Sequence, residues 1–136
     1  CTHNVNDPHV LQCIPSRNGP STDKFRIQLY PEWAPLGAKR FEYLTTSDFW
    51  RDARIFRVMP NFVSQFGLSS DPEVQAIWSS LGAIDDDPIV GVSNDRGTVS
   101  FATSGENTRT TQVFINTEDN WYLDEQGFSP IGKVLG

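Results

Sequence analysis

The residues best suited to chemistry lie in one stretch, 56–67, which reads Phe-Arg-Val-Met-Pro-Asn-Phe-Val-Ser-Gln-Phe-Gly. It places a permanent cation, Arg57, among apolar residues, with an amide, Gln65, a few positions further on. An arginine inside an apolar β-type run either reaches solvent or is held for a purpose. A guanidinium held beside apolar residues is a fixed hydrogen-bond donor, which suits a reaction in which a lone pair develops. The stretch is therefore a candidate site and not merely core.

A second stretch lies far downstream. Residues 98–116 read Thr-Val-Ser-Phe-Ala-Thr-Ser-Gly-Glu-Asn-Thr-Arg-Thr-Thr-Gln-Val-Phe-Ile-Asn, and Leu123-Asp124 and Gly132-Lys133-Val134 follow. These segments, in this order, resemble the signatures of the cyclophilins, the cyclosporin-binding class of peptidyl-prolyl cis-trans isomerases. The resemblance covers roughly 24–134 and is weakest across 68–96. It implies a mostly β fold, a closed antiparallel barrel with at least one capping helix, and an isomerase without metal or organic cofactor.

The resemblance also implies a mechanism in which Arg57 is the catalytic residue. Rotation about an amide is opposed by a barrier of roughly 18–20 kcal/mol, and isomerisation before proline takes tens to hundreds of seconds unaided. As the bond twists, the proline nitrogen regains its lone pair, so a fixed donor stabilises the transition state more than the planar ground state. The substrate-binding residues implied are Phe62, Val63, Phe114 and Leu123 for the proline ring, and Gln65, Ala102, Thr103, Gln112 and Tyr122 around it.

Taken singly, these residues have simpler interpretations. Apolar strand residues are usually core, Arg57 alone is most often solvated, and Gln65 is a surface amide or a satisfied core one. Phe56 and Gly127 stand where many members have histidine, and Tyr122 aligns with the tryptophan that contacts cyclosporin, which makes cyclosporin binding doubtful. The alternative is a proline-peptide binding module with little or no activity. A third interpretation is an unrelated acidic β-barrel that binds a sugar or apolar molecule through its tryptophans.

Composition limits the class of protein. The chain has 136 residues, 38% of them hydrophobic and 12% aromatic, which suits one domain with one core. Its net charge of -6 disfavours nucleic acid, and no apolar run is long enough to cross a membrane. The partners expected are proline-containing peptides or unfolded protein segments, bound by a monomer. The compartment stays open, with a secretory-pathway or membrane-anchored parent among the alternatives.

The N-terminal segment, residues 1–9, precedes the expected domain. Residues 1–9 are polar and rich in Asn, Asp and Pro, which predicts an irregular lead-in before a domain over 10–136. Cys1 and Cys13 could be free thiols or one disulfide. With His3 and His9 they could also be imagined as a zinc site, but the spacing matches no standard one, so we predict no metal.

The remaining pattern predicts the order of the elements. Strands are expected over 10–14 and 24–30, forming a hairpin, and a helix from Pro35 to Thr46. Residues 68–96 are expected to form a long structured loop, with a short helical turn near 73–81 and a solvated acidic turn at 85–87. Strands return over 98–103 and 112–116. The family continues with a further helix and strand that this chain lacks, so either the barrel closes differently or the terminus has been trimmed.

Overall fold

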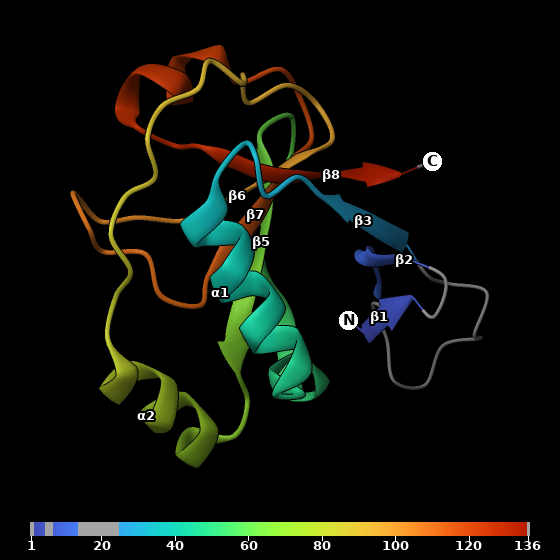
Figure 1. Ribbon diagram of the computed structural model, residues 1–136, viewed down its shortest axis with the longest axis vertical. Helices are drawn as coiled ribbons and strands as arrows, with labels where there is room; N and C mark the ends of the chain where they lie inside the picture. Colours follow the sequence, from blue (N-terminus) through green and yellow to red (C-terminus); the bar gives the residue numbers. More distant parts are fainter. Residues whose placement is uncertain (1, 5–6, 14–24, 136) are drawn as a thin grey trace.

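The computed structural model describes residues 2–4, 7–13 and 25–135, and in it an antiparallel sheet curls around one long helix (Figure 1). The strands are β1 (Thr2–Asn4), β2 (Asp7–Cys13), β3 (Phe25–Leu29), β4 (Ala53–Met59), β5 (Val63–Ser69), β6 (Thr98–Phe101), β7 (Val113–Asn116) and β8 (Pro130–Leu135). The helices are α1 (Pro35–Thr46) and α2 (Pro72–Leu81), with 3-10 turns η1 (Phe49–Asp52) and η2 (Trp121–Gln126). Across the sheet the order is β1-β2-β3-β8-β6-β7-β5-β4.

The sheet is an open half-barrel, so the prediction of a closed barrel is wrong in this respect. Among the described strands, β4 pairs only with β5 and forms one edge of the sheet, and β1 forms the other. Ile55 and Val58 lie opposite Phe66 and Ser64, on the core face, yet they are 45% and 64% exposed. A barrel closes only when its two edge strands are joined, and the described strands supply no such pairing.

Helix α1 forms where the sequence predicts it and fills the concave face of the sheet. Pro35 occupies the first turn, where its missing N–H costs no hydrogen bond. Ala38, Phe41 and Leu44 recur at helical spacing, and each is 0–1% exposed. The core that this face joins contains Leu11, Cys13, Ile27, Leu29, Ala34, Phe49, Trp50, Phe66, Trp78, Val99, Phe101, Val113 and Ile131.

The segment 68–96 contains more regular structure than the sequence predicted. Strand β5 continues to Ser69, and α2 is a full helix of 10 residues where one short helical turn was expected. The carboxylate of Asp71 accepts a hydrogen bond from the Glu73 N–H at 2.9 Å, which caps the helix, and Gly82 ends it with a φ of 82°. A long connection then returns from α2 to β6 (Figure 1).

The acidic turn in that connection holds the N-terminus of α1. Asp87 is 7% exposed, so the prediction of a solvated turn is wrong at this residue. Its Oδ1 accepts from Leu36 N at 2.7 Å, and its Oδ2 accepts from Gly37 N at 2.9 Å and Arg109 Nη1 at 2.9 Å. The carboxylate is buried because the positive end of the helix and a guanidinium both compensate its charge. A Cβ on Gly37 would lie 2.7 Å from Ile131 Cγ2, so this close approach requires glycine.

The N-terminal segment is also more ordered than the expected lead-in. β1 and the first residues of β2 lie within 1–9, and β2 pairs with β3 as the predicted hairpin. Cys13 is buried and disulfide-bonded. Cys1 and the side chains of His3 and His9 lie outside the part of the chain that the structure describes. No helix among the described residues is both long and apolar enough to span a membrane.

Candidate active site

Alternation along the strands gives the sheet a core face and a second face, and the second face carries the candidate residues. Residues directly opposite each other in antiparallel strands share a face, and successive residues alternate. Arg57 lies opposite Gln65, and Gln65 lies opposite Phe114. Phe66 and Val113, one position along their strands, belong to the core. The register therefore places Arg57, Gln65 and Phe114 on one face.

A β-bulge at Phe56 decides the face on which Arg57 lies. Ile55 pairs with Phe66 and Arg57 pairs with Gln65, so Phe56 is an extra residue in β4. In a regular strand Ile55 and Arg57 would share the core face, because they are separated by one residue. The bulge moves Arg57 to the other face, where its side chain is exposed.

The four predicted proline-pocket residues come together as a small apolar cluster. Val63, Phe114 and Leu123 are each 5% exposed, and Phe62 packs against them. Val63 and Phe114 come from β5 and β7, Phe62 from the turn before β5, and Leu123 from η2. Ala102, which follows β6, packs on the same cluster. The fold thus brings together residues from four separate parts of the chain.

Two glutamines form the polar border of this cluster. Gln65 Nε2 donates a hydrogen bond to Gln112 Oε1 at 3.0 Å. The Gln112 carbonyl accepts from Ala102 N at 2.9 Å, which fixes the backbone between β6 and β7. The Thr103 hydroxyl bonds within the loop that follows, accepting from Gly105 N at 2.9 Å. Thr103 follows the cluster residue Ala102, and its side chain stabilises its own loop.

Tyr122 and Trp121 differ in their relation to the cluster. The Tyr122 ring stacks on Phe62, with centroids 6.1 Å apart and planes at 20°, and it is 54% exposed. Trp121 Nε1 instead donates to Asp95 Oδ1 at 3.2 Å. Tyr122 is thus the aromatic residue beside the cluster. Weak or absent cyclosporin binding stays a prediction.

Phe128 belongs to the same cluster, although the sequence analysis did not single it out. Its ring packs edge-on against Phe114, with centroids 5.5 Å apart at 73°. The resemblance aligns Gly127 with a histidine of many family members. In this chain Gly127 has a φ of 85° and ends η2. The turn that it makes directs the chain back to β8. The sequence signal that could have identified Phe128 is its position as an apolar residue directly after a glycine that ends a helical turn.

Asp124 follows the cluster residue Leu123 in η2, and hydrogen bonds hold its carboxylate. Its Oδ2 accepts from Ser93 Oγ at 2.6 Å, and its Oδ1 accepts from Asn94 N at 2.8 Å and Asn94 Nδ2 at 2.7 Å. Burial by itself raises the pKa of Asp124, but the hydrogen bonds from Ser93 and Asn94 favour the charged form and lower the pKa overall. Asp124 is therefore a structural anion and not a proton donor at neutral pH.

An open hollow of about 490 Å³ adjoins the cluster, because Phe128 of the cluster helps to line it, together with Thr103. The charged side chains in its lining are those of Asp86, Glu106 and Glu125. Within the described residues, no group of three or more His, Cys, Asp or Glu side chains is arranged to hold a metal ion. The arrangement offers an apolar contact surface, amide groups and a nearby guanidinium.

Comparison with known proteins identifies the family. Residues 18–136 match the family described as cyclophilin type peptidyl-prolyl cis-trans isomerase/CLD. The chain is 34% identical over 115 residues to a peptidyl-prolyl cis-trans isomerase of Acinetobacter baylyi, covering 80% of this chain and 60% of that protein. It is 34% identical over 121 residues to peptidyl-prolyl cis-trans isomerase A of Dickeya dadantii, covering 85% and 62%. The chain thus spans only part of the length of these relatives.

Solved structures agree on the fold. A crystal structure of a cyclophilin type peptidyl-prolyl cis-trans isomerase of Cryptosporidium parvum has a TM-score of 0.68 and 23% identity, covering 85% of this chain and 74% of that one. A second, determined in the presence of the dipeptide Ala-Pro, has a TM-score of 0.68 and 22% identity, covering 85% and 75%.

The unrelated β-barrel is thereby excluded, and the four tryptophans have other surroundings. Trp50 and Trp78 are buried in the core, and Trp33 stacks on Tyr30 with ring centroids 4.2 Å apart. Trp121 is the tryptophan bound to Asp95. With its two signatures brought to one face of the sheet and its family model matched over most of its length, the chain belongs to the cyclophilin-type peptidyl-prolyl cis-trans isomerase family.

Proposed function

We propose that this chain is the isomerase domain of a protein that accelerates rotation about Xaa-Pro bonds in peptides and partly folded proteins. One observation carries the proposal: the apolar cluster, the Gln65–Gln112 pair and Arg57 lie on one face of the sheet. Family membership supports it. No metal or organic cofactor is needed, because the reaction breaks no covalent bond.

In this mechanism the proline ring rests on the apolar cluster, and Arg57 acts on its nitrogen. Phe62, Phe114 and Leu123 hold the ring, so that only the residue before proline moves as the bond rotates. The Arg57 guanidinium donates to the proline nitrogen as the nitrogen becomes pyramidal and its lone pair is localised. This interaction is absent in the planar ground state, so it lowers the barrier without tightening substrate binding equally.

The polar groups beside the cluster orient the peptide. The amide of Gln65, held by Gln112, is placed to bond a substrate backbone group next to Arg57. The backbone at Ala102 and Thr103 follows the last residue of β6 and offers N–H and C=O groups to an extended segment, as in strand-like peptide recognition. The substrate class is therefore an extended peptide that contains proline.

The first prediction tests the role of Arg57. Replacing it (Arg57→Ala) should lower the catalysed exchange of a proline tetrapeptide by about 10²- to 10³-fold, the usual effect of losing one transition-state donor. The measurement is cis/trans exchange by NMR, which needs no coupling protease. Arg26→Ala is the matched control, because Arg26 is also an exposed strand arginine but lies in β3. Equal exchange rates in Arg57→Ala and Arg26→Ala would reject the assignment.

A binding module with little activity is the second candidate, and the exposed position of Arg57 on the edge strand favours it. In water a guanidinium interacts more weakly than in a site that excludes water. For such a module, peptide would shift the NMR signals of Phe62, Gln65 and Phe114 while exchange stayed at its spontaneous rate. The same NMR experiment on the unaltered chain therefore separates the two candidates.

A further inference from the structure

Asn94 is the centre of a buried polar network that is hydrogen-bonded to residues of the apolar cluster. It is 0% exposed. Its Oδ1 accepts from Ser100 Oγ at 2.8 Å and from Asn116 Nδ2 at 3.1 Å. Its Nδ2 donates to Asp124 Oδ1 at 2.7 Å and to the Phe128 carbonyl at 2.9 Å. The amide thus uses both acceptor and both donor positions, so it cannot move without leaving a buried group unpaired.

The network reaches the cluster by two routes, which end at two aromatic residues. The first is the direct bond from Asn94 to the Phe128 carbonyl. The second passes through Asn116, whose Oδ1 accepts from Asn120 Nδ2 at 2.8 Å. Asn120 Nδ2 also donates to the Phe62 carbonyl at 3.0 Å. The chain of three amides, Asn94, Asn116 and Asn120, therefore ties together the backbones of Phe62 and Phe128.

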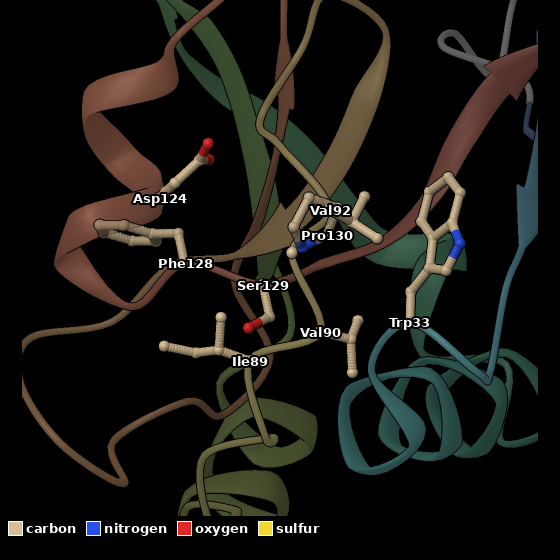
Figure 2. Close-up of a pocket in the computed structure, with 9 residues that line it drawn as sticks. Trp33, Ile89, Val90, Val92, Asp124, Phe128, Ser129 and Pro130 are labelled. Atoms are coloured by element: carbon tan, nitrogen blue, oxygen red, sulfur yellow. The ribbon is translucent and has the colours of Figure 1, made fainter.

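Side-chain packing does not fill all of the space beside Phe128. A cavity of about 80 Å³ borders this residue, and Asp124 also contributes to its lining. Figure 2 shows Phe128 and Trp33 at opposite sides of it, with Ile89 and Val90 on the connection between α2 and β6. Ile89 and Val90 are 76% and 55% exposed, so they provide weak support. A segment next to an unfilled space needs hydrogen bonds to fix its position.

A further set of bonds holds the two ends of the network together. The Asn94 carbonyl accepts from Asn120 N at 2.8 Å, and the Phe62 carbonyl accepts a second bond from Thr117 N at 3.0 Å. Asn94 also bonds to Asp124 through its backbone N–H at 2.8 Å. These bonds join the segment before β6 to the turn that carries η2. Loss of Asn94 would therefore affect Phe62 as well as Phe128.

We propose that Asn94 is a positioning residue for the proline site, which acts through the three amides to set the separation of Phe62 and Phe128 on either side of the apolar cluster. This rests on the proposed function only in that the cluster holds proline. Asn94 touches no substrate. Its effect is to keep these two aromatic members of the cluster at the separation at which the cluster accepts a proline ring.

The test measures ring positions and peptide binding separately. In the free protein, NOEs between Phe62 and Tyr122 and between Phe114 and Phe128 report the ring positions. Asn94→Ala should weaken both NOEs and raise the Kd of the dipeptide Ala-Pro by about tenfold. Asn120→Ala should weaken only the Phe62–Tyr122 NOE, with a smaller rise in Kd. The rate of exchange of a saturating proline peptide should fall less than the rate at low peptide concentration, because Arg57 is intact.

Thr45→Val is the matched control for loss of stability. Thr45 is 7% exposed in α1, and its hydroxyl donates to the Phe41 carbonyl at 2.9 Å and accepts from Trp50 Nε1 at 3.0 Å. This variant loses buried hydrogen bonds remote from the cluster. It should unfold at lower urea concentration while both NOEs and the Kd stay within about twofold of the original values.

The outcomes separate this inference from the proposed function. Unchanged NOEs and Kd in folded Asn94→Ala, or equal changes in Thr45→Val, would overturn the positioning role. If Asn94→Ala does not fold, an unchanged Phe62–Tyr122 NOE in Asn120→Ala overturns it. If the unaltered chain neither binds Ala-Pro nor accelerates exchange, the proposed function fails, while the NOEs of the variants still decide whether Asn94 positions Phe62 and Phe128.

Discussion

At the scale of single residues, Asp124 shows how a charged group can belong to a site without taking part in its chemistry. Its carboxylate accepts hydrogen bonds from Ser93 and twice from Asn94. These bonds outweigh the effect of burial and lower the pKa of Asp124 below its ordinary value of 3.8. The folded chain therefore stabilises the ionised form of Asp124. The stability that it contributes therefore depends on pH.

The second prediction follows from the sign of this shift. Because the pKa of Asp124 is lower in the folded chain than in the unfolded one, its contribution is fully present above the unfolded pKa. It is lost as the pH falls through the folded pKa. The difference in free energy of unfolding between the unaltered chain and Asp124→Asn should therefore shrink as the pH falls below the unfolded pKa and through the lower folded one.

Urea unfolding at several pH values measures this difference. Glu125→Gln controls for the loss of one negative charge, since Glu125 is an exposed neighbour in η2. The free energies of unfolding of Asp124→Asn and the unaltered chain are compared at each pH. If their difference stays constant across the acid range, the proposed role of the Asp124 charge is contradicted.

At the scale of elements, the N-terminus of α1 depends on a segment about fifty residues away in sequence. Ala34 precedes the helix and forms no side-chain cap. Asp87 accepts the bonds of Leu36 N and Gly37 N and also pairs with Arg109. One carboxylate thus joins the helix, the connection between α2 and β6, and the loop before β7. This contact determines how α1 begins and how the connection lies against it.

The third prediction is that Asp87→Ala destabilises the chain by about 3–5 kcal/mol, because it leaves the Arg109 guanidinium buried and unpaired. It also removes the acceptor of two N–H groups at the helix start. Urea unfolding gives the change in free energy. Asp85→Ala is the control, since this exposed neighbour should change stability by less than about 0.5 kcal/mol. A loss below about 1 kcal/mol for Asp87→Ala would show that the ion pair is dispensable.

At the scale of the whole molecule, the open side of the half-barrel exposes apolar side chains on the edge strand β4. β4 is an edge strand, and its Ile55, Phe56 and Val58 are 45%, 44% and 64% exposed. An edge strand that presents apolar side chains and unpaired backbone groups can pair with another chain. Dilute solutions should hold the expected monomer. Association should increase with concentration.

The fourth prediction tests the β4 edge as the site of this association. In sedimentation velocity at rising concentration, the unaltered chain should increase in mean mass, and Val58→Lys should not, because lysine on an edge strand opposes pairing. Ile77→Lys is the control, since Ile77 is 59% exposed on α2. It should associate like the unaltered chain. If Val58→Lys and Ile77→Lys behave alike, another surface is responsible.

Local sequence determined several of the elements, α1 most clearly. Pro35 and the spacing of Ala38, Phe41 and Leu44 define α1, because these signals depend on backbone preference and on helical periodicity within one segment. Alternation over 24–30 likewise predicted β3, and the bounds of β3 and of the strand expected over 112–116 shifted by at most one residue. The resemblance of 56–67 and 98–116 to the family's signatures was also evident from the sequence, and the family match confirms it.

Only the tertiary structure decided which side chains meet. The bulge at Phe56 moves Arg57 to the face of Gln65, and no local pattern reveals a bulge, because it is defined by pairing with another strand. Asp87 is buried rather than solvated because Arg109 and α1 surround it, and Phe128 joins the cluster because Gly127 turns the chain. Whether the sheet is open or closed also depends on hydrogen bonding between strands that are distant in sequence. Sequence determines local preference, whereas register between distant segments determines contact.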